Sequence, residues 1–327
     1  MWYATKEEAA SGKGTKVAIK VSHPDIHRKV NADMTIFKAM ARQVEHWFPD
    51  MQWMGGLDVV TDFEALMHRQ MDLRIEARNL NRFRENFAAH PELNVEFPRP
   101  IFTTEGVLGE TFAEGQPIND FIHGDYSPEV KKVIADAGVE VSLKMVFTHN
   151  FIHADLHPGN ILINWDGNHP HTKPHIVCLD AGLAYQVTNH NRFLEITGAL
   201  MMRKGNLAGM HMLDNSGQSS LFDKTQVDAY CGGIQDIVDA AREEQFFEHL
   251  GTYIYEFFRL AYTHQVKLDH NFVCVAMAIK VMEGLAIALD PQLGASTLRS
   301  FHLVDRDTPS NRHASHPHHS SIQQGHS

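Results

Sequence analysis

The stretch FIHADLHPGNILI, from Phe151 to Ile163, constrains the fold of this chain more than any other segment. It places His153, Asp155 and Asn160 in a short loop between two apolar pieces, in the pattern H-x-D-x-x-x-x-N. A polar loop held between elements of the core usually carries function, because a rigid scaffold positions it. We therefore expect a catalytic or ligand-binding loop at this place.

Three further residues extend this pattern. Lys20 lies in the β-branched run VAIKV, Glu76 lies on an expected helix, and Asp180 follows an apolar strand pattern twenty residues after the loop asparagine. Phosphoryl transfer from a nucleotide uses a strand lysine, a helical glutamate that orients it, a carboxylate at the nucleophile, and an Asn and an Asp that hold Mg²⁺. The residues follow one another in this order, so the sequence predicts a phosphotransferase that uses ATP and Mg²⁺.

Periodicity predicts strands in the first part of the chain and mainly helices in the second. Strands are expected at Val17–Val21 and in VEFPRPIF and GVLGETF, with helices over Val30–Phe48 and Thr61–Phe87. Further along, a helix is expected over Pro128–His149, followed by short strands in ILIN and HIVCLD. Helical spacing then continues over Asn191–Leu289.

The pattern over Thr61–Phe87 is interpreted as one continuous helix, with Asp58 or Thr61 as its N-cap. Its inward positions are predicted from apolar residues at helical spacing: Phe63, Leu66, Met67, Leu73, Leu80 and Phe83.

These patterns divide the chain into four segments, with a boundary between lobes near residues 113–117. We expect a flexible arm at 1–16, a partial small lobe with inserted helices at 17–115, a helical large lobe with the catalytic loop at 116–304, and a disordered His- and Ser-rich tail at 305–327. The fold class that fits is α+β, a protein-kinase-like bilobal fold with a reduced small lobe of strands and helices and a mainly helical large lobe.

Composition argues against several classes of protein. Hydrophobic residues make up 43% of the 327 residues, which is enough for a sizeable core, and the net charge of −11 argues against a nucleic-acid partner. The three cysteines form no CxxC pair, so neither a disulfide framework nor a structural zinc site is expected. The apolar run Phe272–Leu289 is interrupted by Lys280 and Glu283, and predicts a buried helix rather than a membrane span. No secretory or transit signal is recognised at the N-terminus.

Two other motifs are set aside. SGKGTK lacks the earlier glycine and the preceding strand of a phosphate-binding P-loop, so it is interpreted as a solvated arm. The His-rich stretches GNHPHTKPH and the tail have no fixed spacing on rigid elements, so we expect no specific metal site there.

The motif HADLHPGN, followed by LDAG and preceded by MDLRIEARNLNRFRENF, resembles the UbiB/aarF-domain family of atypical kinases. The resemblance covers about residues 15–295 and includes VAIKVSHPDI and AIKVMEGLAIALDP. It implies ATP and Mg²⁺ as cofactors and a role supporting coenzyme Q (ubiquinone) or isoprenoid-lipid metabolism. It also implies a small lipidic molecule, coenzyme Q biosynthesis proteins or a membrane surface as partners, and a mitochondrial location.

The resemblance assigns roles residue by residue. Lys20 would be the nucleotide lysine with Glu76 as its partner, Asp155 would take the catalytic position, and Asn160 and Asp180 would be the metal ligands. Gln70 and Asp72 would form the family's acidic motif. The backbone of Glu110, Thr111 and Phe112 would form the hinge that meets adenine. His153 and His157 would support the catalytic loop.

The chain departs from the family pattern at three places. The family's KxGQ motif and Ala-rich loop do not stand in the sixteen residues before Val17, so we expect a fragment in which the VAIK strand loses a neighbour and the phosphates lose their cover. Ala181 replaces the Phe that ordinary kinases carry after the metal-binding Asp, which affects switching more than chemistry. Gln70 replaces the acidic residue two before Asp72, which weakens the acidic motif.

Two other functions stay open. One is a catalytically impaired binding module that lacks the cover over the nucleotide and contacts a partner or membrane lipid. The other is a small-molecule kinase of the aminoglycoside or choline type, which shares the H-x-D-x-x-x-x-N loop. Those kinases tend to carry an acidic residue soon after the metal-binding Asp, where this chain has Ala181-Gly182-Leu183.

Overall fold

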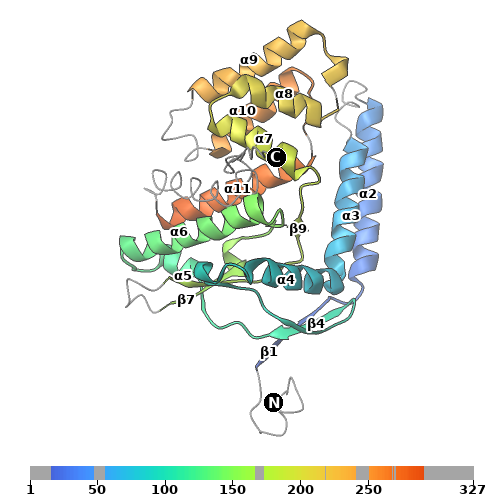
Figure 1. Ribbon diagram of the computed structural model, residues 1–327. Helices are drawn as coiled ribbons and strands as arrows, with labels where there is room; N and C mark the ends of the chain where they lie inside the picture. Colours follow the sequence, from blue (N-terminus) through green and yellow to red (C-terminus); the bar gives the residue numbers. More distant parts are fainter. Residues whose placement is uncertain are drawn as a thin grey trace, which may run out of the picture.

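The structure is a computed structural model that describes residues 16–47, 56–165, 173–217, 219–240, 250–266, 268 and 270–290. Figure 1 shows a small sheet at one end of the molecule and a group of helices at the opposite end. The arm up to residue 15, most of the His-rich loop, at 166–172, and the tail at 305–327 lie outside the described residues, so their predicted properties remain predictions.

The small sheet is antiparallel, with the strand order β1–β4–β3. β1 is Val17–Val21, β3 is Pro100–Thr103 and β4 is Val107–Thr111, close to the predicted strands. Lys20 pairs with Leu108, whose side chain is completely buried. Because directly paired residues share one face of a sheet, Lys20 lies on the face that packs toward the core.

Two long helices form a hairpin beside this sheet. α2 (Ile26–Trp47) and α3 (Gly56–Met71) lie side by side in Figure 1. The predicted N-caps Asp58 and Thr61 are wrong, because α3 already begins before both of them. Phe63, predicted to point inward, is 44% exposed, so this part of the hairpin does not face the core.

The single helix predicted over Thr61–Phe87 is also wrong. The chain breaks at Asp72, which has an extended backbone, and α4 (Leu73–Phe87) begins there as a separate helix. Asp72 accepts a hydrogen bond from the backbone N of Arg74 at 3.0 Å, as an N-cap does. One face of α4 is buried, and it comprises Leu73, Glu76, Ala77, Leu80, Phe83 and Phe87.

The second sheet has the strand order β2–β8–β7–β5. β5 (Gln116–Pro117), β7 (Ile161–Asn164) and β8 (His175–Cys178) come from the predicted large lobe. β2 (Val95–Glu96) comes from the predicted small lobe and pairs in parallel with β8. The second sheet therefore joins strands from both predicted lobes, and the boundary near residues 113–117 remains a prediction.

The remainder of the described chain is mainly helical, with a two-stranded pair of β6 (Ile152–His153) and β9 (Ala184–Tyr185). The π-helix Lys144–Thr148 replaces the end of the helix predicted to run to His149. The α-helices are α5 (Ile118–His123), α6 (Pro128–Leu143), α7 (His190–Met201), α8 (Gly205–Asn215), α9 (Lys224–Ala240), α10 (Leu250–Thr263) and α11 (His270–Leu289). Within the described residues, none of the helices has the length and apolar character needed to cross a membrane.

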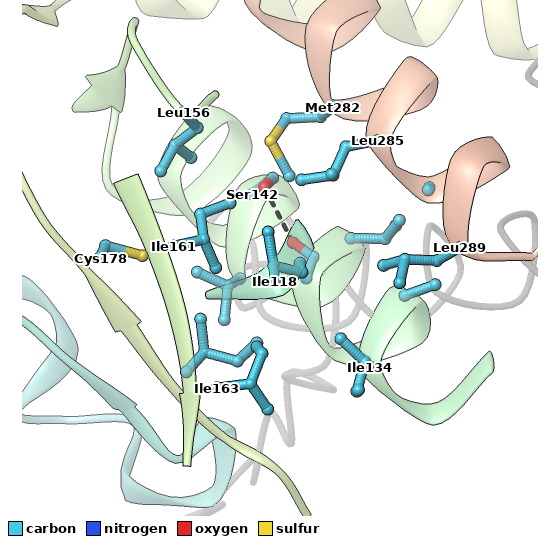
Figure 2. Close-up of a pocket in the computed structure, with 16 residues that line it drawn as sticks. Ile118, Ile134, Ser142, Leu156, Ile161, Ile163, Cys178, Met282, Leu285 and Leu289 are labelled. Atoms are coloured by element: carbon cyan, nitrogen blue, oxygen red, sulfur yellow. Dashed lines mark hydrogen bonds between the residues drawn. The ribbon is translucent and has the colours of Figure 1, made fainter. Parts of the chain in front are cut away.

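An apolar pocket lies between α5, α6, β7 and α11 (Figure 2). Leu156 of the predicted catalytic loop lines it together with Met282 and Leu285 of α11. The polar side chain in its wall, Ser142, donates its hydroxyl to the backbone O of Gly138 at 2.8 Å. With no charged group in its lining, this pocket anchors the loop rather than binding a phosphate.

His149 is half-buried, and its ring makes no hydrogen bond to the described residues. Both ring nitrogens lack a partner among the described residues, and the ring packs edge-on against Phe87 with 4.6 Å between centroids. Burial, aided by the neighbouring His90, lowers the pKa of His149 to about 4. The folded protein therefore holds this imidazole in its neutral form.

We predict that this histidine makes the fold sensitive to acid. Because the folded pKa is about 4 and the ordinary value is 6.5, the unfolded chain takes up the proton first as the pH falls. Its contribution to stability is complete above about pH 6.5 and is lost down to about pH 4. Urea unfolding across this range should show a flatter pH dependence for His149→Phe than for wild type. The exposed-site variant His123→Gln should follow wild type, and equal slopes for His149→Phe and wild type would contradict the prediction.

Candidate active site

Lys20, Glu76 and Asp180 meet in what we call the lysine cluster. Nζ of Lys20 lies 2.9 Å from Oε2 of Glu76 and 2.8 Å from Oδ2 of Asp180. The three residues come from β1, from α4 and from the turn after β8. The tertiary fold thus brings together three of the five residues predicted to act on a nucleotide, at ion-pair distance.

The lysine cluster is only partly open to solvent. The side chain of Glu76 is 3% exposed, whereas Lys20 is 40% and Asp180 is 41% exposed. Burial alone would lower the pKa of Lys20, but the two carboxylates outweigh it and raise that pKa. Burial raises the pKa of Glu76, with Lys20 opposing it, whereas the hydrogen bond from Lys20 overcomes burial and lowers the pKa of Asp180. Lys20 and Asp180 are therefore charged at neutral pH.

His153 joins the catalytic loop to the segment that leads to Asp180. Its ring lies 3.0 Å from the backbone O of Leu179 through Nε2 and 3.2 Å from the backbone N of Asp155 through Nδ1. A carbonyl only accepts and an amide N–H only donates, so the ring is neutral with its proton on Nε2. Burial lowers the pKa of His153, which favours this neutral form.

The side chain of Asn160 folds back onto the same loop. Its Nδ2 donates to the backbone O of Asp155 at 3.0 Å, which leaves Oδ1 as the acceptor end of the amide. His157 accepts from the backbone N of Gly159 at 3.0 Å and caps the short helical turn that contains Asn160. Both side chains therefore fix the loop backbone around Asp155.

The turn at Asp180 has an unusual backbone. Asp180 has φ of +52°, in the left-handed region that non-glycine residues seldom adopt and that Asp tolerates better than most. A Cβ at Gly182 would lie 3.2 Å from Oδ1 of Asp180, so the glycine leaves room for this carboxylate. Backbone strain of this kind tends to occur at functional sites.

Sequence reasoning missed Asn79. It lies one helical turn after Glu76, and its Nδ2 donates to the backbone O of Ala181 at 2.8 Å. This bond holds α4 against the turn that carries Asp180. The signal was available in the sequence, because residues three apart on a helix share a face and Glu76 was already assigned to the site.

The predicted hinge is only partly as expected. The backbone N of Thr111 donates to Arg99 O at 3.0 Å, and the backbone N of Phe112 donates to Lys16 O at 3.3 Å. These two N–H groups are used within the protein, and contact of the hinge backbone with adenine remains a prediction. Glu110, the third residue of this set, has its side chain on the core face of the sheet, opposite Ala18.

The two residues at the predicted acidic motif, Gln70 and Asp72, lie where α3 ends and α4 begins. Gln70 lies in the last turn of α3, and Asp72 caps α4. Nε and Nη2 of Arg74 lie 2.8 Å and 2.9 Å from the two oxygens of Asp72, and this hydrogen bonding lowers the pKa of Asp72. Within the described chain, Asp72 therefore acts at the start of the helix that presents Glu76.

The predicted metal ligands fit Mg²⁺ in their chemistry. Among the described residues, no group of three or more His, Cys, Asp and Glu side chains is placed to hold a metal ion. Mg²⁺ in phosphotransfer sites needs only one or two protein oxygens, because phosphate and water oxygens complete its shell. The ionised Asp180 and Oδ1 of Asn160 are oxygens of this kind.

A strand lysine paired with a helical glutamate, and a braced H-x-D-x-x-x-x-N loop next to an aspartate turn, define a kinase-like protein. A solved structure of Rv3197 in complex with erythromycin, from Mycobacterium tuberculosis, has the same fold, with a TM-score of 0.57 and 17% identity over 85% of this chain and 68% of that chain. The family profile of the ABC1 atypical kinase-like domain matches residues 7–208. The chain belongs to this family, and the predicted family and α+β kinase-like fold are confirmed.

Two relatives show the range of the family. The mitochondrial ABC1 family protein YPL109C of Saccharomyces cerevisiae is 27% identical, over 84% of this chain and 49% of that protein. The probable protein kinase UbiB of Cronobacter sakazakii is 27% identical, over 86% of this chain and 51% of that protein. The chain spans about half the length of these relatives.

We predict that Ala181 cannot be replaced by the Phe of ordinary kinases. Its side chain is 0% exposed and belongs to the main core, so a larger ring must displace its neighbours. Ala181→Phe should lower the free energy of unfolding by about 1–3 kcal/mol, measured by urea denaturation. The matched change Ala65→Phe, at an exposed site on α3, should change it by less than about 0.5 kcal/mol. An Ala181→Phe protein as stable as wild type would show that the core has room for the ring.

Proposed function

We propose that this chain binds ATP with Mg²⁺ at the lysine cluster and transfers the γ-phosphoryl group to an acceptor or to water. The observation that supports this most directly is the charged Lys20, held 2.9 Å from Glu76 and 2.8 Å from Asp180. A cation fixed by a buried carboxylate is suited to the α- and β-phosphates of a nucleotide. The family match favours an atypical kinase over a kinase of the aminoglycoside or choline type.

Each residue of the cluster has a separate task in this proposal. Glu76 keeps the ammonium of Lys20 in place, and Lys20 neutralises phosphate charge. Asp180 and Asn160 would hold Mg²⁺, which when bound neutralises the phosphate oxygens and aligns them. Because Lys20 contacts Asp180 directly, phosphate binding would replace part of this ion pair with a lysine–phosphate contact.

We assign to Asp155 the role of orienting the attacking nucleophile and accepting its proton. Its backbone N is bonded to His153 and its backbone O to Asn160, so the residue is held at both ends. Its side chain is partly exposed and forms no ion pair with the described residues, so in this proposal it is available to a substrate. In this role the carboxylate orients a hydroxyl or a water and accepts its proton as the phosphoryl group departs.

We also propose that the reaction supports coenzyme Q or isoprenoid-lipid metabolism in mitochondria. Support comes from the relatives, which include proteins named UbiB and ABC1 proteins described as mitochondrial. In this proposal the partner is a small lipidic molecule or a protein of coenzyme Q biosynthesis, at a membrane surface.

Binding tests the first step. Isothermal titration calorimetry with Mg-ATP should show binding to wild type, and Asp180→Asn should weaken it about 10- to 100-fold, as expected for the loss of a charged ligand group. The exposed-site variant Asp62→Asn on α3 should bind as wild type does. Equal affinities of Asp180→Asn and wild type would remove Asp180 from the nucleotide site.

Turnover tests the second step. Asp155→Asn should retain Mg-ATP binding and lose about 10²- to 10⁴-fold in phosphate release, because it removes the proton acceptor. Asp125→Asn, at an exposed position, serves as the matched control. Full turnover by Asp155→Asn would exclude that role. Tight binding without turnover by wild type would instead favour the binding-module function.

A further inference from the structure

Glu110 lies on the face of the small sheet that carries the lysine cluster. In the β1–β4 ladder, Glu110 pairs with Ala18 and Leu108 pairs with Lys20. Residues two apart on a strand share a face, so the side chains of Glu110 and Lys20 are on the same side. This register places Glu110 next along the same face of the sheet from Lys20.

One oxygen of this carboxyl group has no partner. Oε2 of Glu110 is shielded from solvent and accepts no hydrogen bond from the described residues. Lys20, the nearby cation, is bonded to Glu76 and Asp180 instead. An unpaired buried acceptor costs about 1–3 kcal/mol, so Glu110 would gain from a donor supplied by a ligand.

The strand geometry places a nucleotide base next to Glu110. β1 ends one residue after Lys20, at Val21, so most of the strand lies on the N-terminal side of Lys20, where Ala18 is. With its phosphates at Lys20, a nucleotide would have its base about 7 Å along the strand, two residues away. Ala18 and Glu110 pair at that position, and the small side chain of Ala18 leaves room for a flat ring.

Two backbone donors near that position are already in use. The backbone N of Thr111 donates to Arg99 O, just before β3, and the backbone N of Phe112 donates to Lys16 O, just before β1. On this part of β4, the carboxyl group of Glu110 has a shielded side-chain oxygen without a hydrogen bond from the described residues. The base of a bound nucleotide would therefore be recognised by a side chain at this point.

We propose that Glu110 is a specificity-determining residue, whose carboxylate accepts a hydrogen bond from the exocyclic 6-amino group of adenine and selects against guanine. This inference rests on the proposed function, because it assumes that a nucleotide binds at the lysine cluster. Guanine carries an oxygen at position 6, which is an acceptor and would face the acceptor of Glu110. A buried polar site of this kind rejects a ligand that leaves its group unpaired.

The test compares Mg-ATP with Mg-GTP. Dissociation constants are measured by calorimetry on the full chain for wild type, Glu110→Gln and Glu110→Leu, at about pH 8, where the carboxyl group is ionised. Wild type should prefer ATP. Glutamine can accept from adenine or donate to guanine, so Glu110→Gln should reduce the GTP/ATP ratio of dissociation constants about tenfold or more. Glu114→Gln, at a nearby exposed position, should leave the ratio unchanged.

The ionisation of Glu110 supplies a second readout. Burial, and then the charge of Glu76, raise the pKa of Glu110 to about 7, with Asp180 adding to this effect and Lys20 opposing it. Below that pH the protonated acid can donate to the oxygen of guanine, so the preference of wild type for ATP should weaken as the pH falls through about 7. Glu110→Gln should show no such change. Titration of the triphosphate is common to both nucleotides and cancels in the ratio.

Stability separates this role from a structural one. A carboxyl group that serves a ligand leaves its oxygen unpaired in the free protein, so Glu110→Leu should be at least as stable as wild type in urea unfolding. Marked destabilisation of Glu110→Leu, or an unchanged nucleotide ratio in Glu110→Gln, would overturn the inference. In the second case ATP still binds and the proposed function stands. Failure of folded wild type, checked by circular dichroism, to bind either nucleotide would overturn the proposed function and this inference together.

Discussion

The ion pair between Lys20 and Glu76 is the contact around which this fold is organised. Glu76 is 3% exposed, and a buried carboxylate without a cation would be strongly destabilising, so α4 requires Lys20 on β1. Asp180, in the turn after β8 of the second sheet, forms an ion pair with the same ammonium group. The ammonium of Lys20 therefore connects the small sheet, α4 and the turn after β8. The arrangement proposed for phosphate binding depends on this connection.

The catalytic loop is held by a different kind of interaction. Its charged residue, Asp155, is positioned through its backbone by a neutral histidine on one side and an amide on the other. Leu156 anchors the same loop in an apolar pocket that α11 closes (Figure 2). Neutral hydrogen bonds and apolar packing fix the loop without adding charge, so the carboxylate of Asp155 remains free of ion pairs with the described residues.

Several features of the site oppose stability. Asp180 has a left-handed backbone, and Glu110 keeps a buried oxygen without a donor. Groups of this kind tend to occur at functional sites, and their presence next to the lysine cluster is consistent with the nucleotide site proposed above. The capping role of Asp72 is different, because its carboxylate is fully used in starting α4.

Local patterns in the sequence were enough to predict the strands β7 and β8, the loop between apolar pieces, and the order of Lys20, Glu76, Asp155, Asn160 and Asp180. The strands and the loop depend on residues close together in the chain, where alternation and spacing are encoded directly, and the five residues follow the order of parts in a phosphotransferase. The break at Asp72, the pairing of β2 with β8, and the facing of Glu110 toward the lysine cluster could not be predicted in this way. Each depends on contacts between segments far apart in sequence, because a strand pattern shows which residues alternate but not which strand or helix will cover them.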